Sequence, residues 1–153
     1  MSLQLKHYKT TLVGLDGSAN SLSALEKAGE LARSMDAKLV LVTVVKPKLQ
    51  VGFGGPGLEV NTLSAEQLEV KQEQAQKMLA HYQVKLPEKV KYQAVVVIGD
   101  PKEMLSEILP KKYQAELVIV GATGLNKLDR FILGSTAAYV VRNTKTDTLV
   151  VNE

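Results

Sequence analysis

The sequence predicts an α/β fold: one domain with an open, five-stranded parallel sheet and helices on both of its faces. Five short apolar runs alternate with stretches of helical periodicity. Several of these runs are nearly continuous in Val, Leu and Ile, which is typical of strands that are covered on both sides. Strands that alternate with helices pair in parallel through right-handed crossovers.

The apolar runs give the expected strands. They cover residues 10–15, 38–45, 92–98, 117–120 and 148–151. The run at 38–45 is the longest of the five.

The first two helices carry signals for their N-termini. After the first strand, apolar residues recur at helical spacing, and Ser18, Asn20 or Ser21 can cap the helix. Ser64 and Gln67 have the spacing of a capping box, which predicts the start of a long second helix.

The third helix has both a start and a break. Asp100 is a suitable N-cap, Pro101 fits the first helical position, and Glu103 fits the third. Pro110 cannot donate a hydrogen bond to the carbonyl of Ser106, so we expect the helix to kink or end early there.

Length and composition favour a single globular domain over residues 1–153. Hydrophobic residues make up 45% of the chain and charged residues 23%, and the net charge of +3 is too small to favour nucleic acid as a partner. Without cysteine, disulfides and thiol chemistry are excluded. No apolar run has the length of a membrane helix or a signal peptide, so we expect a cytoplasmic protein.

One glycine-rich stretch, within residues 46–61, is expected to be a flexible loop. It could be mistaken for a phosphate-binding loop, but no Lys-Ser or Lys-Thr pair follows its glycines. Pro56 within it has no N–H to offer to a phosphate.

A second set of glycines lies between the fourth strand and the last helix. Gly121 and Gly124 follow the strand, and Gly134 and Ser135 open the helix. Glycines in this position let backbone N–H groups approach a phosphate. If strands one and four are neighbours, Asp16 at the end of the first strand faces the same cleft. Alternatively, the glycines serve only tight turns and Asp16 caps the first helix.

The glycine pattern carries a resemblance to a known family. Gly121, Gly124, Gly134 and Ser135 match without gaps the Gly-x2-Gly-x9-Gly-Ser/Thr motif of ATP-binding universal stress proteins. The chain resembles that family from about residue 9 to residue 151. The resemblance implies a Rossmann-like sheet with the strand order 3-2-1-4-5.

The resemblance also implies a nucleotide site. Its residues would be Asp16, Val44, Gly121, Gly124, Gly134, Ser135 and Thr136. Asp16 would accept hydrogen bonds from the ribose, the backbone of Val44 would pair with adenine, and Gly121 would lie against the sugar. The other four would hold the phosphates of ATP, with Mg²⁺ or Mn²⁺ bridging phosphate oxygens and no side chain as a direct metal ligand. Gly121→Val should then remove binding with little loss of fold.

Two cations lie between the motif glycines. Lys127 and Arg130 either approach the phosphates or remain on the surface. Family members often carry a hydroxyl residue where this chain has Ala137, so one phosphate contact is expected to be missing.

The implied function is ATP binding in stress response or signalling. Nucleotide occupancy would act as a switch that an unknown protein partner reads. The protein would dimerise through its last strand, Thr148, Leu149, Val150 and Val151. We expect no enzyme, because no catalytic base is evident besides Asp16, which the sugar would occupy. The alternatives are a slow ATPase or nucleotidyl-transfer enzyme, and a nucleotide-free structural dimer.

Overall fold

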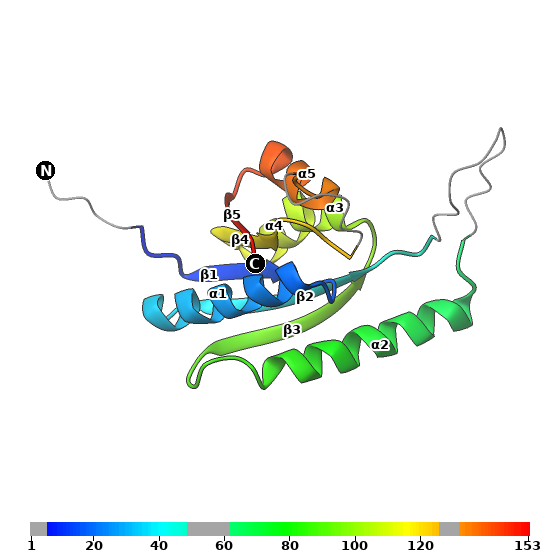
Figure 1. Cartoon of the computed structure of the whole chain (residues 1–153), viewed down its shortest axis with the longest axis horizontal. Coiled ribbons are helices and arrows are strands. Elements are labelled where there is room, and N and C mark those ends of the chain that lie inside the picture. The colour runs from blue at the N-terminus through cyan, green and yellow to red at the C-terminus, as the bar shows by residue number, and fades with distance from the viewer. Residues whose placement is uncertain (1–5, 49–61, 126–131) are drawn as a thin grey trace, which may run out of the picture.

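The protein is built on one parallel sheet. The structure is a computed structural model that describes residues 6–48, 62–125 and 132–153. Its strands are β1 (Thr10–Gly14), β2 (Lys38–Val45), β3 (Lys91–Ile98), β4 (Leu117–Gly121) and β5 (Asp147–Val151). They pair in the order β3-β2-β1-β4-β5, which confirms the predicted topology (Figure 1). No strand bound differs from its predicted position by more than one residue.

Helices cover both faces of the sheet. They are α1 (Ala19–Met35), α2 (Ala65–Gln83), α3 (Pro101–Glu103), the π-helical turn η1 (Met104–Ile108), α4 (Leu109–Tyr113) and α5 (Ser135–Asn143). The first two pack on one face, whereas η1, α4 and α5 pack on the other (Figure 1). Among the described residues, no helix is both long and apolar enough to span a membrane.

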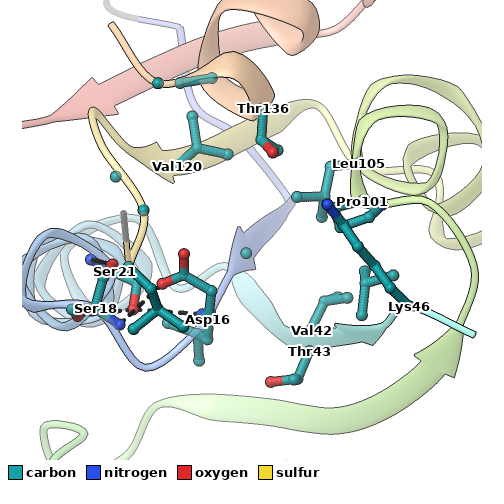
Figure 2. A pocket seen from close by; sticks show the side chains of 18 of the residues that line it. Asp16, Ser18, Ser21, Val42, Thr43, Lys46, Pro101, Leu105, Val120 and Thr136 are labelled. Carbon is teal, nitrogen blue, oxygen red and sulfur yellow. Dashed lines mark hydrogen bonds between the residues drawn. The ribbon is translucent and has the colours of Figure 1, made fainter. Parts of the chain in front are cut away.

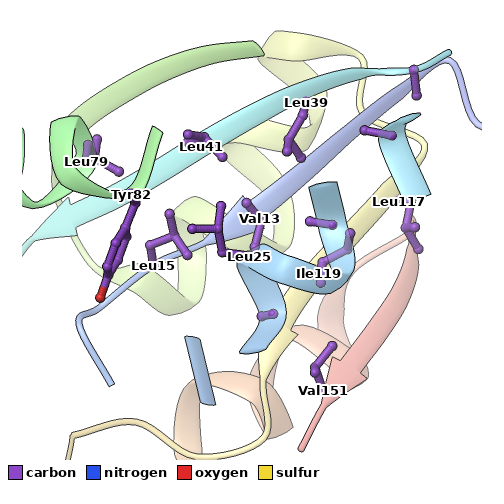
Figure 3. Packing of buried hydrophobic residues seen from close by; sticks show 14 residues of the cluster. Val13, Leu15, Leu25, Leu39, Leu41, Leu79, Tyr82, Leu117, Ile119 and Val151 are labelled. Atoms are coloured by element: carbon purple, nitrogen blue, oxygen red, sulfur yellow. The ribbon is translucent and has the colours of Figure 1, made fainter. Parts of the chain in front are cut away.

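The core has two layers, one on each side of the sheet. Alternate residues of β1 point to opposite faces, with Val13 packed below α1 and Leu12 packed against the other layer. In β2, Leu41 and Val42 divide between the two layers in the same way, and both side chains are almost fully buried. Figure 3 shows the first layer, in which Leu25 of α1 lies over the strands. Burial on both faces explains the unbroken apolar runs.

The first two long helices begin at serine caps. Ser18 is the cap of α1, because its Oγ accepts from the Ser21 N–H at 3.1 Å. Ser64 and Gln67 form the predicted capping box, with reciprocal bonds of 3.2 and 2.9 Å between side chain and backbone. Both starts therefore follow from local hydrogen bonding that the sequence encodes.

Asp100 caps α3 as predicted, but Pro110 does not end the helix. The chain remains helical to Tyr113, so the expectation of an early end was wrong, while the alternative of a kink stays a prediction. In the wider η1 turn, the Leu109 N–H donates to the carbonyl of Met104, five residues earlier. This turn ends two residues before the proline, where a regular α-helix would drive the proline ring into the carbonyl of Ser106. The π-turn thus accommodates a residue that would otherwise break the helix.

An ionic contact ties the segment before β1 to the start of β5. Lys6 Nζ lies 2.6 Å from Asp147 Oδ2, and the Tyr8 hydroxyl donates to the same oxygen at 3.0 Å. The hydrogen bonds from Lys6 and Tyr8 lower the pKa of Asp147. The same contact raises the pKa of Lys6, while burial and the bond to Asp147 raise that of Tyr8.

The pH dependence of this contact can be measured directly. Because the folded pKa of Asp147 is depressed, its contribution to stability is present at neutral pH and is lost as the pH falls through that pKa. In an NMR titration, the Asp147 carboxyl should titrate below its ordinary value of 3.8. Lys6→Ala should raise the midpoint toward that value. A midpoint that Lys6→Ala leaves unchanged would show that the lysine does not hold the carboxylate.

Candidate functional site

A cleft of about 690 Å³ opens at the carboxyl ends of β1, β2 and β4 (Figure 2). The strand order reverses at this point, because the chain extends from β1 to β2 and β3 on one side and to β4 and β5 on the other. Helices on both faces contribute walls, α2 from one side and α5 from the other. Open parallel sheets bind their ligands at such switch points.

The predicted site residues converge on this cleft. Its lining includes Asp16, Val44, Gly121, Gly124, Gly134, Ser135 and Thr136. The prediction of a common cleft required the first and fourth strands to be neighbours, and β1 and β4 are indeed paired, with Val13 opposite Ile119. The structure therefore shows a common location, and the role of each residue toward a nucleotide stays a prediction.

Asp16 offers one carboxylate oxygen to the cleft. Its Oδ1 accepts from the Ser18 N–H at 2.9 Å, one of the bonds drawn in Figure 2. Oδ2 lies beside Gly124, where a Cβ atom would come within 2.8 Å of it. Because Ser18 is the residue that caps α1, Asp16 is not needed as the cap. One oxygen shapes the turn, and the other faces the glycine segment.

The N-terminus of α5 presents backbone amides to the same cleft. Gly134 is its N-cap and has no side chain to satisfy them, whereas α1 and α2 are each capped by a serine. The first intrahelical bond runs from the Ala138 N–H to the Gly134 carbonyl at 2.9 Å. The amides of residues 135–137 thus have no acceptor within the helix. Such amides, together with the helix dipole, favour an anion.

Gly121 has a structural role that the sequence did not reveal. A Cβ atom there would lie 2.8 Å from the carbonyl carbon of Asn20 and 2.9 Å from the Ser21 nitrogen. The end of β4 therefore packs directly on the backbone of the first turn of α1. The expectation that Gly121→Val leaves the fold intact is wrong, because this side chain would have to displace the helix.

Two lysines of the cleft were missed by sequence reasoning. Lys46 follows β2 as Asp16 follows β1, so the position after a strand end was a usable signal. Figure 2 shows its side chain reaching toward Pro101 and Leu105. Lys71 comes from α2, whose approach to the cleft depends on the tertiary fold. The cations that were predicted, at positions 127 and 130, lie outside the described residues, as do residues 49–61 of the loop predicted over residues 46–61.

The wall of the cleft that β2 and α2 form contains a buried hydroxyl group. Thr43 is 7% exposed, and its Oγ1 has no hydrogen-bond partner among the described residues. Thr43 lines the cleft together with Ala75 and Met78 of α2. A buried hydroxyl without a partner costs free energy. A polar group of a ligand in the cleft would offset that cost.

The fold and the cleft define an open α/β protein whose candidate ligand site combines a carboxylate with a glycine-rich segment and a helix N-terminus that has no side-chain cap. The model of the universal stress protein family matches residues 7–152. The chain therefore belongs to the universal stress protein family.

Known relatives agree with this assignment. A Staphylococcus aureus (strain USA300) protein assigned to the universal stress proteins is 30% identical over 146 residues, which is 94% of this chain and 84% of the relative. A solved universal stress protein in complex with cAMP is 28% identical, with a TM-score of 0.66 over 96% of this chain and 98% of the other. A universal stress protein of Lactobacillus plantarum, 23% identical, has the same fold, with a TM-score of 0.78 over 96% of this chain and 99% of the other.

Proposed function

We propose that the protein binds an adenine nucleotide, ATP with Mg²⁺ or Mn²⁺, and acts in the cytoplasm as a dimer in stress response or signalling. In this proposal, nucleotide occupancy is the switch that a protein partner reads. The N-terminus of α5, which has no side-chain cap and shares one cleft with Asp16, is the observation that carries it. A relative that is 28% identical to this chain is in complex with cAMP, which supports an adenine nucleotide.

The residues present fit such a ligand. The amides that follow Gly134, with the hydroxyls of Ser135 and Thr136, suit phosphate oxygens. Asp16 Oδ2 suits the ribose hydroxyls, and the backbone of Val44 suits the adenine edge. Among the described residues, no three His, Cys, Asp or Glu side chains come together to hold a metal ion. In the proposal, the phosphates of the bound nucleotide would hold the Mg²⁺ or Mn²⁺.

Calorimetry with ATP and magnesium tests the proposal. We expect saturable binding at one site per chain, and mass spectrometry of the purified protein should detect an adenine nucleotide. Folded protein, verified by circular dichroism, that binds neither ATP nor AMP would overturn the proposal and favour the nucleotide-free structural dimer.

The proposal is for binding without turnover. Hydrolysis needs a positioned base or a group that orients water, and in this proposal Asp16 is occupied by the sugar. Phosphate release from ATP should stay at the background rate. A steady release well above background, lost in a variant with a blocked cleft, would favour the slow ATPase or nucleotidyl-transfer alternative.

Changing Lys46 to alanine should weaken ATP binding more than AMP binding. The lysine lines the cleft and makes no ion pair among the described residues, so its charge is available to the outer phosphates. We expect about a fivefold loss of affinity for ATP, which corresponds to about 1 kcal/mol for one charge-assisted bond. Calorimetry on both nucleotides measures it. Lys48→Ala is the matched control, because Lys48 is exposed and does not line the cleft. Equal losses for both nucleotides would contradict a role at the outer phosphates.

The proposed dimer uses β5 as an edge strand. Within the part of the chain that the structure describes, it pairs only with β4, and Thr148, Leu149 and Val150 are half-buried. An unpaired edge can accept the same strand of a second copy. A lysine on this edge should prevent it, so we expect Thr148→Lys to be monomeric by analytical ultracentrifugation. Tyr92→Lys on β3, the other edge strand, is the control and should remain a dimer. If Tyr92→Lys is monomeric and Thr148→Lys remains a dimer, the interface lies on β3 and not on β5.

A further inference from the structure

Asn20 connects the first turn of α1 to the glycine segment of the cleft. Asn20 is only 5% exposed, and its side-chain Nδ2 donates a hydrogen bond to the Thr123 Oγ1. Thr123 lies between Gly121 and Gly124 and is half-buried. Asn20 itself does not line the cleft, whereas Thr123 does. The contact thus joins a buried helical residue to a segment that faces the candidate ligand.

Further contacts hold the same segment from both sides. The Ser18 hydroxyl lies 3.5 Å from the Thr123 carbonyl oxygen, to which it can donate. Gly121 packs on the backbone of Asn20. From the other side, the Gly134 N–H donates to the Ala122 carbonyl at 2.7 Å. The segment 121–124 is therefore fixed between the first turn of α1 and the N-terminus of α5.

The first turn of α1 also fixes Asp16. Ser18 donates its N–H to Asp16 Oδ1, and the Asp16 N–H donates to the Ser21 Oγ at 3.4 Å (Figure 2). The Ser21 hydroxyl in turn donates to the Ser18 carbonyl at 2.9 Å. One helical turn therefore anchors the two sides of the cleft, the carboxylate and the glycine segment.

We propose that Asn20 is a positioning residue for nucleotide binding. Through Thr123, it sets the backbone of residues 123–124 against Asp16 before the ligand arrives. An ordered segment loses less conformational entropy on binding, which raises affinity without a direct contact to the ligand. This inference rests on the proposed function, because the ligand is the nucleotide proposed above.

A double-mutant cycle tests the inference. Asn20→Ala and Thr123→Val each remove the hydrogen bond, and each should lower the affinity for ATP and magnesium about five- to tenfold. Because both remove the same bond, the double variant should lose no more than either single variant. Thr123→Ser keeps the hydroxyl and should stay within about twofold of the wild type. Calorimetry well below the lowest Tm of the set separates this effect from a loss of stability.

A second measurement needs no nucleotide. In the ligand-free protein, Asn20→Ala and Thr123→Val should shift the same amide NMR signals, those of residues 121–124. Different sets of shifted signals would overturn the positioning role even if ATP does not bind. If the wild type binds ATP and the single variants bind equally well, or if their losses multiply in the double variant, the inference fails while the proposed function stands. A wild type that binds no nucleotide overturns both.

Discussion

Gly121→Val should lower the free energy of unfolding by about 3 kcal/mol, the upper end of the usual cost of overpacking. The reason is that its Cβ would meet the backbone of Asn20 and Ser21, which belongs to a buried helical turn and cannot rotate away as a side chain could. Chemical denaturation at pH 7 measures the loss. Gly121→Ala should show a smaller loss in the same direction.

The contrary outcome is informative. If Gly121→Val unfolds at the same denaturant concentration as the wild type but no longer binds ATP, the glycine serves only the ligand. The contact between β4 and α1 would then have to yield without cost, which the packing of Gly121 on α1 argues against.

Gly124→Val should abolish measurable ATP binding, a loss of at least about a hundredfold or about 2.8 kcal/mol. A Cβ at this position would come within 2.8 Å of Asp16 Oδ2, and the branched side chain would occupy the cleft beside that oxygen. The nearby atom is the end of a side chain, so the carboxylate can move and the fold should persist. Calorimetry measures the affinity, and denaturation should give an unfolding free energy within about 0.5 kcal/mol of the wild type.

Gly124→Val also has a distinct contrary result. Unimpaired binding by Gly124→Val would place the nucleotide away from Asp16 and the glycine segment. A large loss of stability would instead assign Gly124 a packing role like that of Gly121. We thus expect the two glycines of one motif to differ: substitution of Gly121 mainly lowers the stability of the fold, and substitution of Gly124 mainly lowers the affinity for ATP.

The strands were predictable because each is marked by an apolar run that can be recognised within a short stretch of the sequence. The run predicted for β2 had the right bounds, since both of its faces are buried and Thr43 is its only polar residue after Lys38. The capping box at Ser64 and the cap at Asp100 were likewise visible in the sequence. The predicted early end at Pro110 was wrong, because a π-turn shortly before the proline removes the steric conflict that a regular helix would suffer.

The candidate site was predictable only in part. Asp16 and the motif glycines follow strand ends, so topology places them together once the strand order is known. The close contact of Gly121 with α1 could not be predicted, because it depends on how a helix lies across a strand distant in sequence. Lys71 reaches the cleft for a similar reason, through the packing of α2.

The η1 turn makes the number of residues in its segment as important as their identity. A regular α-helix turns about 100° per residue, so the extra residue of a π-turn shifts the angular phase of everything before it relative to everything after it. Here Pro101 and Leu105 line the cleft, while Leu109 is buried in the core. Deleting a single residue of η1 would leave the composition almost unchanged, yet would rotate the cleft-facing turn away from its place. The number of residues in η1 therefore sets the orientation of the residues before it, and Pro110, which lies outside the cleft, helps to define this turn.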